Sequence, residues 1–138
     1  MKRFLMGTLM VLLGIAACAQ TQADYAFLNA PYSAAKDFVT LLAAGSFQRA
    51  YGMVAEDARG DYSPEVLSDG WVGLLEQYGN YRDMEVSGAD IEGDRWTVHV
   101  LVTFDKAKVD VALGFNSIKD QEKVLSVSYR RNPGDRRP

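Results

Sequence analysis

The chain has 138 residues, with 15 Lys or Arg and 18 Asp or Glu, so its formal net charge at pH 7 is −3. Hydrophobic residues make up 48% and charged residues 24%, proportions that exclude a disordered chain, a collagen and a coiled coil. The single cysteine excludes an internal disulfide framework, and the single histidine excludes a histidine-rich metal site within one chain. The length suits one domain, and no metal or cofactor is expected.

The first 17 residues are organised like a secretion signal. Lys2 and Arg3 form a positive start, and the 14 residues 4–17 are apolar apart from Thr8 and two glycines. As a helix they would rise only about 21 Å, short of the ~30 Å hydrocarbon core of a membrane. A cleaved signal peptide is therefore a stronger interpretation than a transmembrane helix.

The end of this segment, Ile15-Ala16-Ala17-Cys18, resembles a bacterial lipobox. In such signals the cysteine thiol is acylated and a dedicated peptidase cuts just before it. We therefore predict lipidation of Cys18 and an exported protein anchored in the bacterial cell envelope, since two or more acyl chains anchor stably. Ala19 favours the outer membrane where the host has one. Ordinary secretion is the alternative, because Ala17-Cys18-Ala19 also fits an A-x-A cleavage site.

The predicted organisation is a signal peptide (1–17), a lipid-anchored tether (18–30), one domain (31–130) and a flexible basic tail (131–138). Without the signal, 121 residues remain with 13 basic and 18 acidic side chains, a net charge of −5. This acidity argues against sequence-independent binding to nucleic acid. The tail arginines are interpreted as a solvated end, with contact to anionic lipids or cell-wall polymers as the alternative.

The first half of the domain has helical patterns. A helix is expected from about Pro31 to Ala44, ended by Gly45, and Ser46 is expected to cap a second helix that reaches Val54. Ser63-Pro64-Glu65 is a strong start signal for a third helix, which Gly79 ends. Its apolar residues follow a helical spacing: Leu67, Trp71, Leu74, Leu75 and Tyr78.

The second half changes to period two. Clean alternation of apolar and polar residues occurs over 95–104, 109–115 and 125–129, whereas 81–91 is mixed. Alternation predicts strands with one buried face, and Glu92-Gly93-Asp94 fits a hairpin turn. Four antiparallel strands therefore follow three helices in an α+β architecture, in which Trp71 should lie under the sheet near Val98 and Val100.

This order resembles the cystatin-like α+β cone of the nuclear-transport-factor-like superfamily, over about residues 32–130. The segment FVTLLAAGSFQRAYGMV resembles the opening of its bacterial members. The segment SPEVLSDGWVGLLEQYGNY resembles an uncharacterised bacterial domain family that is sometimes found in front of α/β-hydrolases. The resemblance implies three N-terminal helices packed on a curved four-stranded antiparallel sheet.

The resemblance also implies a pocket between the sheet and the helices. Its expected lining near the mouth is Tyr51, Asp57, Tyr62, Tyr78, Tyr81 and Asp83. An enzyme would use an aspartate as general base and a tyrosine hydroxyl to stabilise an oxyanion. The alternative is that the tyrosines are core aromatics and the aspartates surface charges. His99 alternates with the buried stripe, so it is expected on the outer face of the sheet, solvated or in a dimer interface.

The motifs of nucleotide-binding loops, esterases, zinc proteases and paired-cysteine sites are absent from the sequence. We therefore expect a non-catalytic envelope lipoprotein that binds a partner or a small apolar ligand through the cone. Its partners would be the membrane, through Cys18, and a second copy or another envelope protein. The alternative is a small isomerase- or hydratase-like enzyme that uses Asp and Tyr in the pocket.

Overall fold

The structure is a computed structural model and describes residues 29–134. The predicted signal peptide, Cys18, most of the tether and residues 135–138 lie outside the described residues. Helices precede strands along the described chain. In order, the elements are α2 (Asn29–Ala43), α3 (Phe47–Tyr51), the 3-10 turn η2 (Glu56–Ala58), α4 (Pro64–Tyr78), β1 (Tyr81–Glu92), β2 (Arg95–Phe104), β3 (Lys108–Asn116) and β4 (Ser126–Arg131).

The first two helices differ from their predicted extents. Helix α2 begins at Asn29, two residues before the predicted start, and ends at Ala43, one residue before the predicted end. Gly45 follows it with the expected left-handed conformation, at φ +74°. Helix α3 stops at Tyr51, because Val54 instead forms a parallel β-bridge with Val124. The side chain of Ser46 makes no capping hydrogen bond, so the predicted role of that residue is wrong.

Helix α4 has the predicted bounds. The Ser63 hydroxyl accepts a hydrogen bond from the backbone N–H of Val66 at 3.2 Å, and Gly79 ends the helix with φ +88°. Gly70 lets the helix approach β4, since a Cβ there would lie 3.0 Å from a ring carbon of Tyr129. A Cβ at Gly73 would meet open space, so only the first of these glycines is needed for packing.

The four strands form one antiparallel sheet in the order β1-β2-β3-β4. Strands β2 and β3 pair without interruption, but the register of β1 shifts between Tyr81 and Asp83 and between Val86 and Gly88. Each shift changes which side chains face the core, which explains why residues 81–91 show no clean alternation. Arg131 pairs with Val109, so β4 extends into the region predicted as tail.

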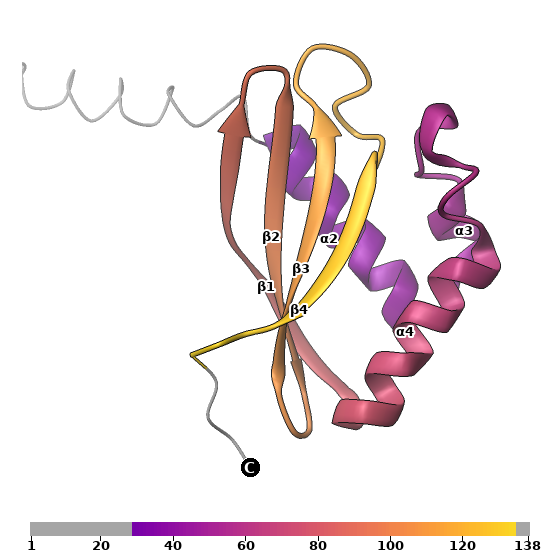
Figure 1. Cartoon of the computed structure of the whole chain (residues 1–138), viewed down its shortest axis with the longest axis vertical. Coiled ribbons are helices and arrows are strands. Elements are labelled where there is room, and N and C mark those ends of the chain that lie inside the picture. Colours follow the sequence, from indigo (N-terminus) through magenta and orange to yellow (C-terminus); the bar gives the residue numbers. More distant parts are fainter. Residues whose placement is uncertain (1–28, 135–138) are drawn as a thin grey trace, which may run out of the picture.

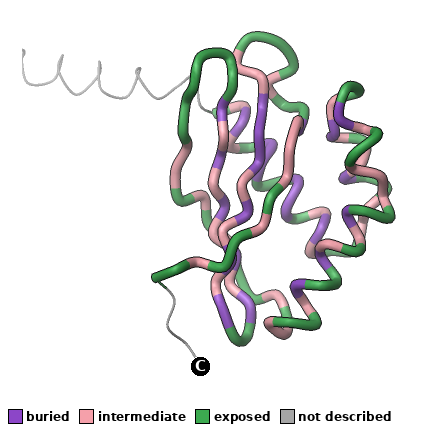
Figure 2. The backbone as a smooth tube through the Cα atoms, in the orientation of Figure 1, coloured by how far each residue is buried: buried purple, intermediate pink, exposed green. Residues whose placement is uncertain are grey.

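The helices cover one face of this sheet, and the buried residues lie between the two layers (Figures 1 and 2). Trp71 is 2% exposed, and its ring lies 5.5 Å from the ring of Phe104 between centroids. The predicted α+β fold and the predicted burial of Trp71 are confirmed. None of the helices in residues 29–134 is long and apolar enough to cross a membrane.

Candidate functional site

The space between sheet and helices is filled by apolar side chains. The inward residues of β2 and β3 that pack there are 0–1% exposed: Val98, Val100, Val102, Phe104, Val109, Val111, Leu113 and Phe115. They form one cluster with Phe38, Leu42 and Trp71. Among residues 29–134 no polar or charged side chain is buried. The described interior is therefore apolar.

The residues expected to line one pocket are not brought together, because they lie at opposite ends of the sheet. Tyr81 pairs with Phe104 at one end of β2, and the Tyr78 ring lies 6.3 Å from the same phenylalanine. Asp57 lies beside Asn116, which pairs with Arg95 at the other end. A strand of 10 residues such as β2 separates these ends by about 30 Å.

The remaining expected members belong to the surface or to the edge of the core. Tyr51 and Tyr62 are half-buried against the core, and the Arg59 guanidinium lies 5.1 Å from the centroid of the Tyr51 ring. Asp83 is exposed on β1. Burial, and to a smaller extent the charge of Asp83, raises the pKa of Tyr81. These positions match core aromatics and surface carboxylates.

The outer face of the sheet carries a histidine between two carboxylates. Nδ1 of His99 lies 3.0 Å from Oδ2 of Asp110, and Nε2 lies 2.8 Å from Oδ2 of Asp90. Burial lowers the pKa of His99, but the hydrogen bonds and charges of the two aspartates outweigh this and raise it above the ordinary 6.5. No group of three His, Cys, Asp or Glu within residues 29–134 is arranged to hold a metal ion. Sequence reasoning placed His99 on this face but missed both aspartates.

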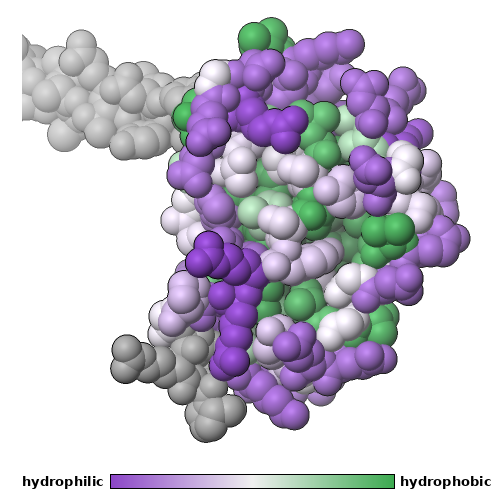
Figure 3. All heavy atoms as spheres, in the orientation of Figure 1, coloured by the Kyte–Doolittle hydropathy of each residue, from purple (hydrophilic) through white to green (hydrophobic). Residues whose placement is uncertain are grey.

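The residues in register with His99 across this outer face are small. The cross-strand partners in its row are Gly88, Ala112 and Ser128. The next row contains Asp90, Thr97, Gly114 and Ser126. Figure 3 shows pale residues together with hydrophobic ones at the centre of this view, and more hydrophilic residues toward its margins. Two such faces could approach closely along these small residues, whereas the row on the other side of His99 contains the longer side chains of Leu101, Asp110 and Arg130.

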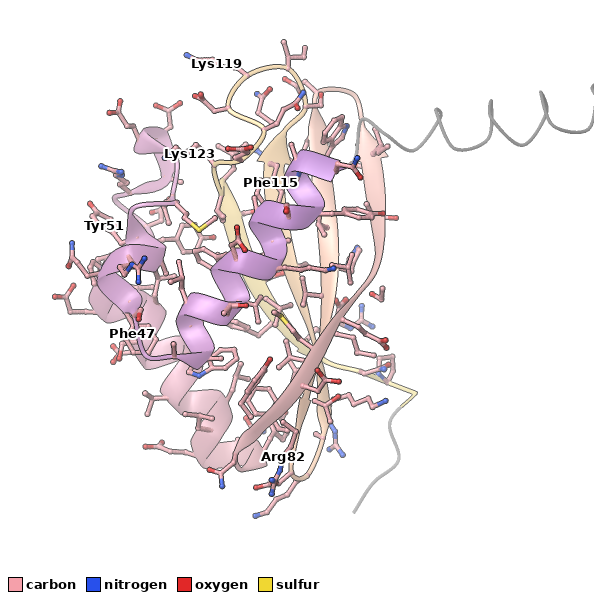
Figure 4. The ribbon with its side chains drawn as sticks, turned by 180° about the vertical axis from the view of Figure 1, so that it is seen from behind. Phe47, Tyr51, Arg82, Phe115, Lys119 and Lys123 are labelled. Carbon is pink, nitrogen blue, oxygen red and sulfur yellow. The ribbon has the colours of Figure 1, made fainter. Side chains whose placement is uncertain are left out.

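A groove of about 310 Å³ lies at the end of the sheet where β3 leads into the β3–β4 loop, residues 117–125. Its other side is formed by η2 and the residues beside it. The lining combines an apolar part, three cations and three carboxylates: Val54, Ala55, Leu125, Arg59, Lys119, Lys123, Glu56, Asp57 and Asp120, with Asn116. Figure 4 shows Lys119 and Lys123 on this loop, away from Arg82 at the opposite end. Asp57 is thus the one expected site residue that lines this groove.

Backbone hydrogen bonds join the two sides of the groove. The N–H of Ala55 donates to the carbonyl of Val124, and the N–H of Val124 donates to the carbonyl of Met53, both at 2.8 Å. Within the loop, Oδ1 of Asn116 accepts from the N–H groups of Ile118 and Lys119, both at 2.8 Å. The two backbone bonds at Val124 connect segments about 70 residues apart, so no local sequence pattern could have revealed the groove.

Comparison with known proteins gives a family and a structural relative. One solved structure that matches is described as an NTF-2 like protein of unknown function from Burkholderia xenovorans LB400, with 16% identity, a TM-score of 0.41, and coverage of 77% of this chain and 80% of that chain. No curated protein matches this chain. Residues 35–124 match the family described as protein of unknown function (DUF3887). The chain therefore belongs to this family, DUF3887.

Proposed function

We propose that this protein is a non-catalytic envelope lipoprotein, anchored through Cys18, whose domain binds a second copy of itself through the outer face of the sheet. The filled interior is the observation that carries the non-catalytic assignment, because Phe38, Trp71 and Phe115 occupy the space that a substrate would need. The same filling favours a protein partner over a small apolar ligand. Asp57 and Asp83 are both exposed, which gives no support to the alternative of an isomerase-like enzyme.

The size of the outer face supports a partner of this kind. Strands of 12, 10, 9 and 6 residues average about 30 Å in length, and four strands span about 19 Å. The projected area is roughly 600 Å², and the accessible area of a corrugated face is larger. Stable protein interfaces bury about 800 Å² per partner, so the whole face is of the required size.

The charges at the two edges of this face favour a second copy. Four exposed carboxylates pair in register with outward residues of β2: Asp83, Glu85, Asp90 and Glu92. The opposite edge strand, β4, presents the exposed Arg130. In a dimer with its twofold axis parallel to the strands, β1 of each copy lies opposite β4 of the other. Unlike charges then meet, whereas the antiparallel alternative places the carboxylates of both copies together.

The oligomeric state tests this assignment. In nonionic detergent, light scattering during size-exclusion chromatography should give a dimer of the full-length protein. The variant Ala112→Arg should be monomeric, because a long cation stands in the middle of the small-residue row. The matched control Ser33→Arg, at an exposed position of α2, should remain dimeric. A monomeric parent protein, or a dimeric Ala112→Arg variant with unchanged circular dichroism, would contradict the proposed interface.

Membrane fractionation tests the anchor separately. The variant Cys18→Ser should lose incorporation of labelled fatty acid and move from the membrane to the soluble fraction, because the acylated thiol is gone. Unchanged fractionation would refute lipid anchoring and favour an uncleaved N-terminal helix.

A further inference from the structure

We propose that the groove at the β3–β4 loop binds a small zwitterion, a molecule of about dipeptide size that carries both an ammonium and a carboxylate group. This site is distinct from the outer face of the sheet. The argument starts from the charges in the lining. Three cations and three carboxylates share a volume of about 310 Å³.

These six side chains leave one another unpaired. None of the six side chains forms an ion pair with another residue of 29–134. Unlike charges gathered without pairing are available to a ligand, which need not break an existing salt bridge to reach them. A simple anion or a simple cation would be attracted by half of the lining and repelled by the other half.

Two of the cations are directed to backbone oxygens instead. Nε of Arg59 donates to the carbonyl of Val54 at 3.2 Å, and the same guanidinium lies over the Tyr51 ring. Nζ of Lys123 donates to the carbonyl of Gly52 at 3.1 Å. These bonds position the positive groups and leave Glu56 and Asp57, on η2, without a cation.

The loop that carries the remaining charges is preorganised. Asp120 has φ +54°, a left-handed conformation, and its carbonyl accepts a hydrogen bond from the N–H of Lys123 at 2.9 Å. The two bonds to Asn116 and the bridge at Val124 hold the ends of the loop. A site that is already ordered loses little conformational entropy when a ligand binds.

The size and polarity of the groove set the class of ligand. A volume of 310 Å³ is at the lower end of the roughly 300–1,000 Å³ typical of ligand sites, which suits a molecule of dipeptide size. Val54, Ala55 and Leu125 offer an apolar surface for an aliphatic part of the ligand. A short peptide with free termini has this combination of separated opposite charges and a short aliphatic portion.

Titration calorimetry of the full-length protein in nonionic detergent tests the proposal. The probe is the dipeptide Glu-Lys with free termini, and the comparison ligands are citrate, an anion, and spermidine, a cation. We expect the dipeptide to bind at least about tenfold more tightly than either. Equal or tighter binding of citrate or spermidine would overturn the proposal, and so would no binding of the dipeptide at millimolar concentration.

Two charge-removing variants locate the site. Lys119→Gln and Asp57→Asn should each weaken dipeptide binding about three- to fivefold, the size expected of partly exposed ion pairs. Lys119→Gln should not change the affinity for a probe without carboxylates, namely Gln-Lys with an amidated C-terminus. Asp57→Asn should have no effect on a probe that lacks both amines. The control variant Lys36→Gln, at an exposed position of α2, should bind the dipeptide with the parent affinity. An equal loss of dipeptide affinity in all three variants would refute the proposed location of the site.

Discussion

Replacing Trp71 by alanine removes the largest of the fully buried side chains. The indole is 2% exposed and contacts the rings of Phe104 and Tyr81, with centroids 5.5 and 6.0 Å away. Phe104 lies on β2 and Tyr81 begins β1, so this one side chain joins α4 to two strands. The change therefore creates a cavity at the junction of the two layers.

The expected loss is large relative to the total stability. Truncation of a buried tryptophan costs about 3–5 kcal/mol. The 106 described residues imply a free energy of unfolding of roughly 5–16 kcal/mol, at 0.05–0.15 kcal/mol per residue. At about 4 °C per kcal/mol for a domain of this size, Trp71→Ala should lower the Tm by about 12–20 °C, or prevent folding altogether.

Circular dichroism at 222 nm, followed during heating and urea unfolding, measures this effect without relying on tryptophan fluorescence. The matched control is Val72→Ala, the next residue of the same helix, which is 39% exposed and should change stability by about 0.5 kcal/mol or less. If Trp71→Ala lowers the Tm by less than about 4 °C, the described position of the indole is refuted. So would equal effects of the two variants.

The other predictions concern a turn, a histidine and a tyrosine. Gly79→Ala should lower the Tm, because the residue has φ +88° and a Cβ would lie 2.7 Å from the Cβ of Asp105. Gly73→Ala should instead stabilise α4 by about 0.5–1 kcal/mol, because a Cβ there meets open space. Equal effects of the two variants in thermal melts would contradict this prediction. His99 has a raised pKa in the folded state, so its contribution to stability should be complete below pH 6.5 and decrease as the pH rises through the folded value. A difference in Tm between the parent and His99→Gln that is independent of pH from 5 to 9 would refute the two-aspartate arrangement. Burial, and secondarily the charge of Tyr62, raises the pKa of Tyr129 to about 12. Ultraviolet titration should therefore show a tyrosine that ionises near pH 12, and Tyr129→Phe should remove that step. Because the unfolded chain ionises first, stability should decrease between pH 10 and 12 in the parent and less in Tyr129→Phe.

Elements with local signals could be predicted from the sequence. The bounds of α4 follow from Ser63, Pro64 and Gly79, residues that act on the backbone next to them. The alternation of β2 follows equally from side chains within one strand. Strand β1 was harder because its two register shifts change the inward face, and such shifts depend on the partner strand.

The candidate sites depend on distant segments and were therefore only partly predictable. The filling of the interior is decided by the combined volume of side chains from α2, α4 and the sheet, and no single segment reveals it. The contact of His99 with Asp90 and Asp110 requires the register of three strands. The groove requires residues 53–59 to meet residues 116–125. Asp57 is expected at a pocket mouth only because the family resemblance implies one, and nothing in the sequence indicates its neighbours in the groove.

The order of elements along the chain has a consequence for biosynthesis. The apolar face of α2, with Phe38, Val39 and Leu42, belongs to one buried core cluster with strand residues as late as Phe115. About 70 residues must follow Leu42 before that partner exists, which takes roughly 4–15 s at a synthesis rate of 5–20 residues per second. During this interval the sheet is incomplete, and the core around α2 is not closed. Chains truncated after β2 should therefore aggregate more readily than the full domain.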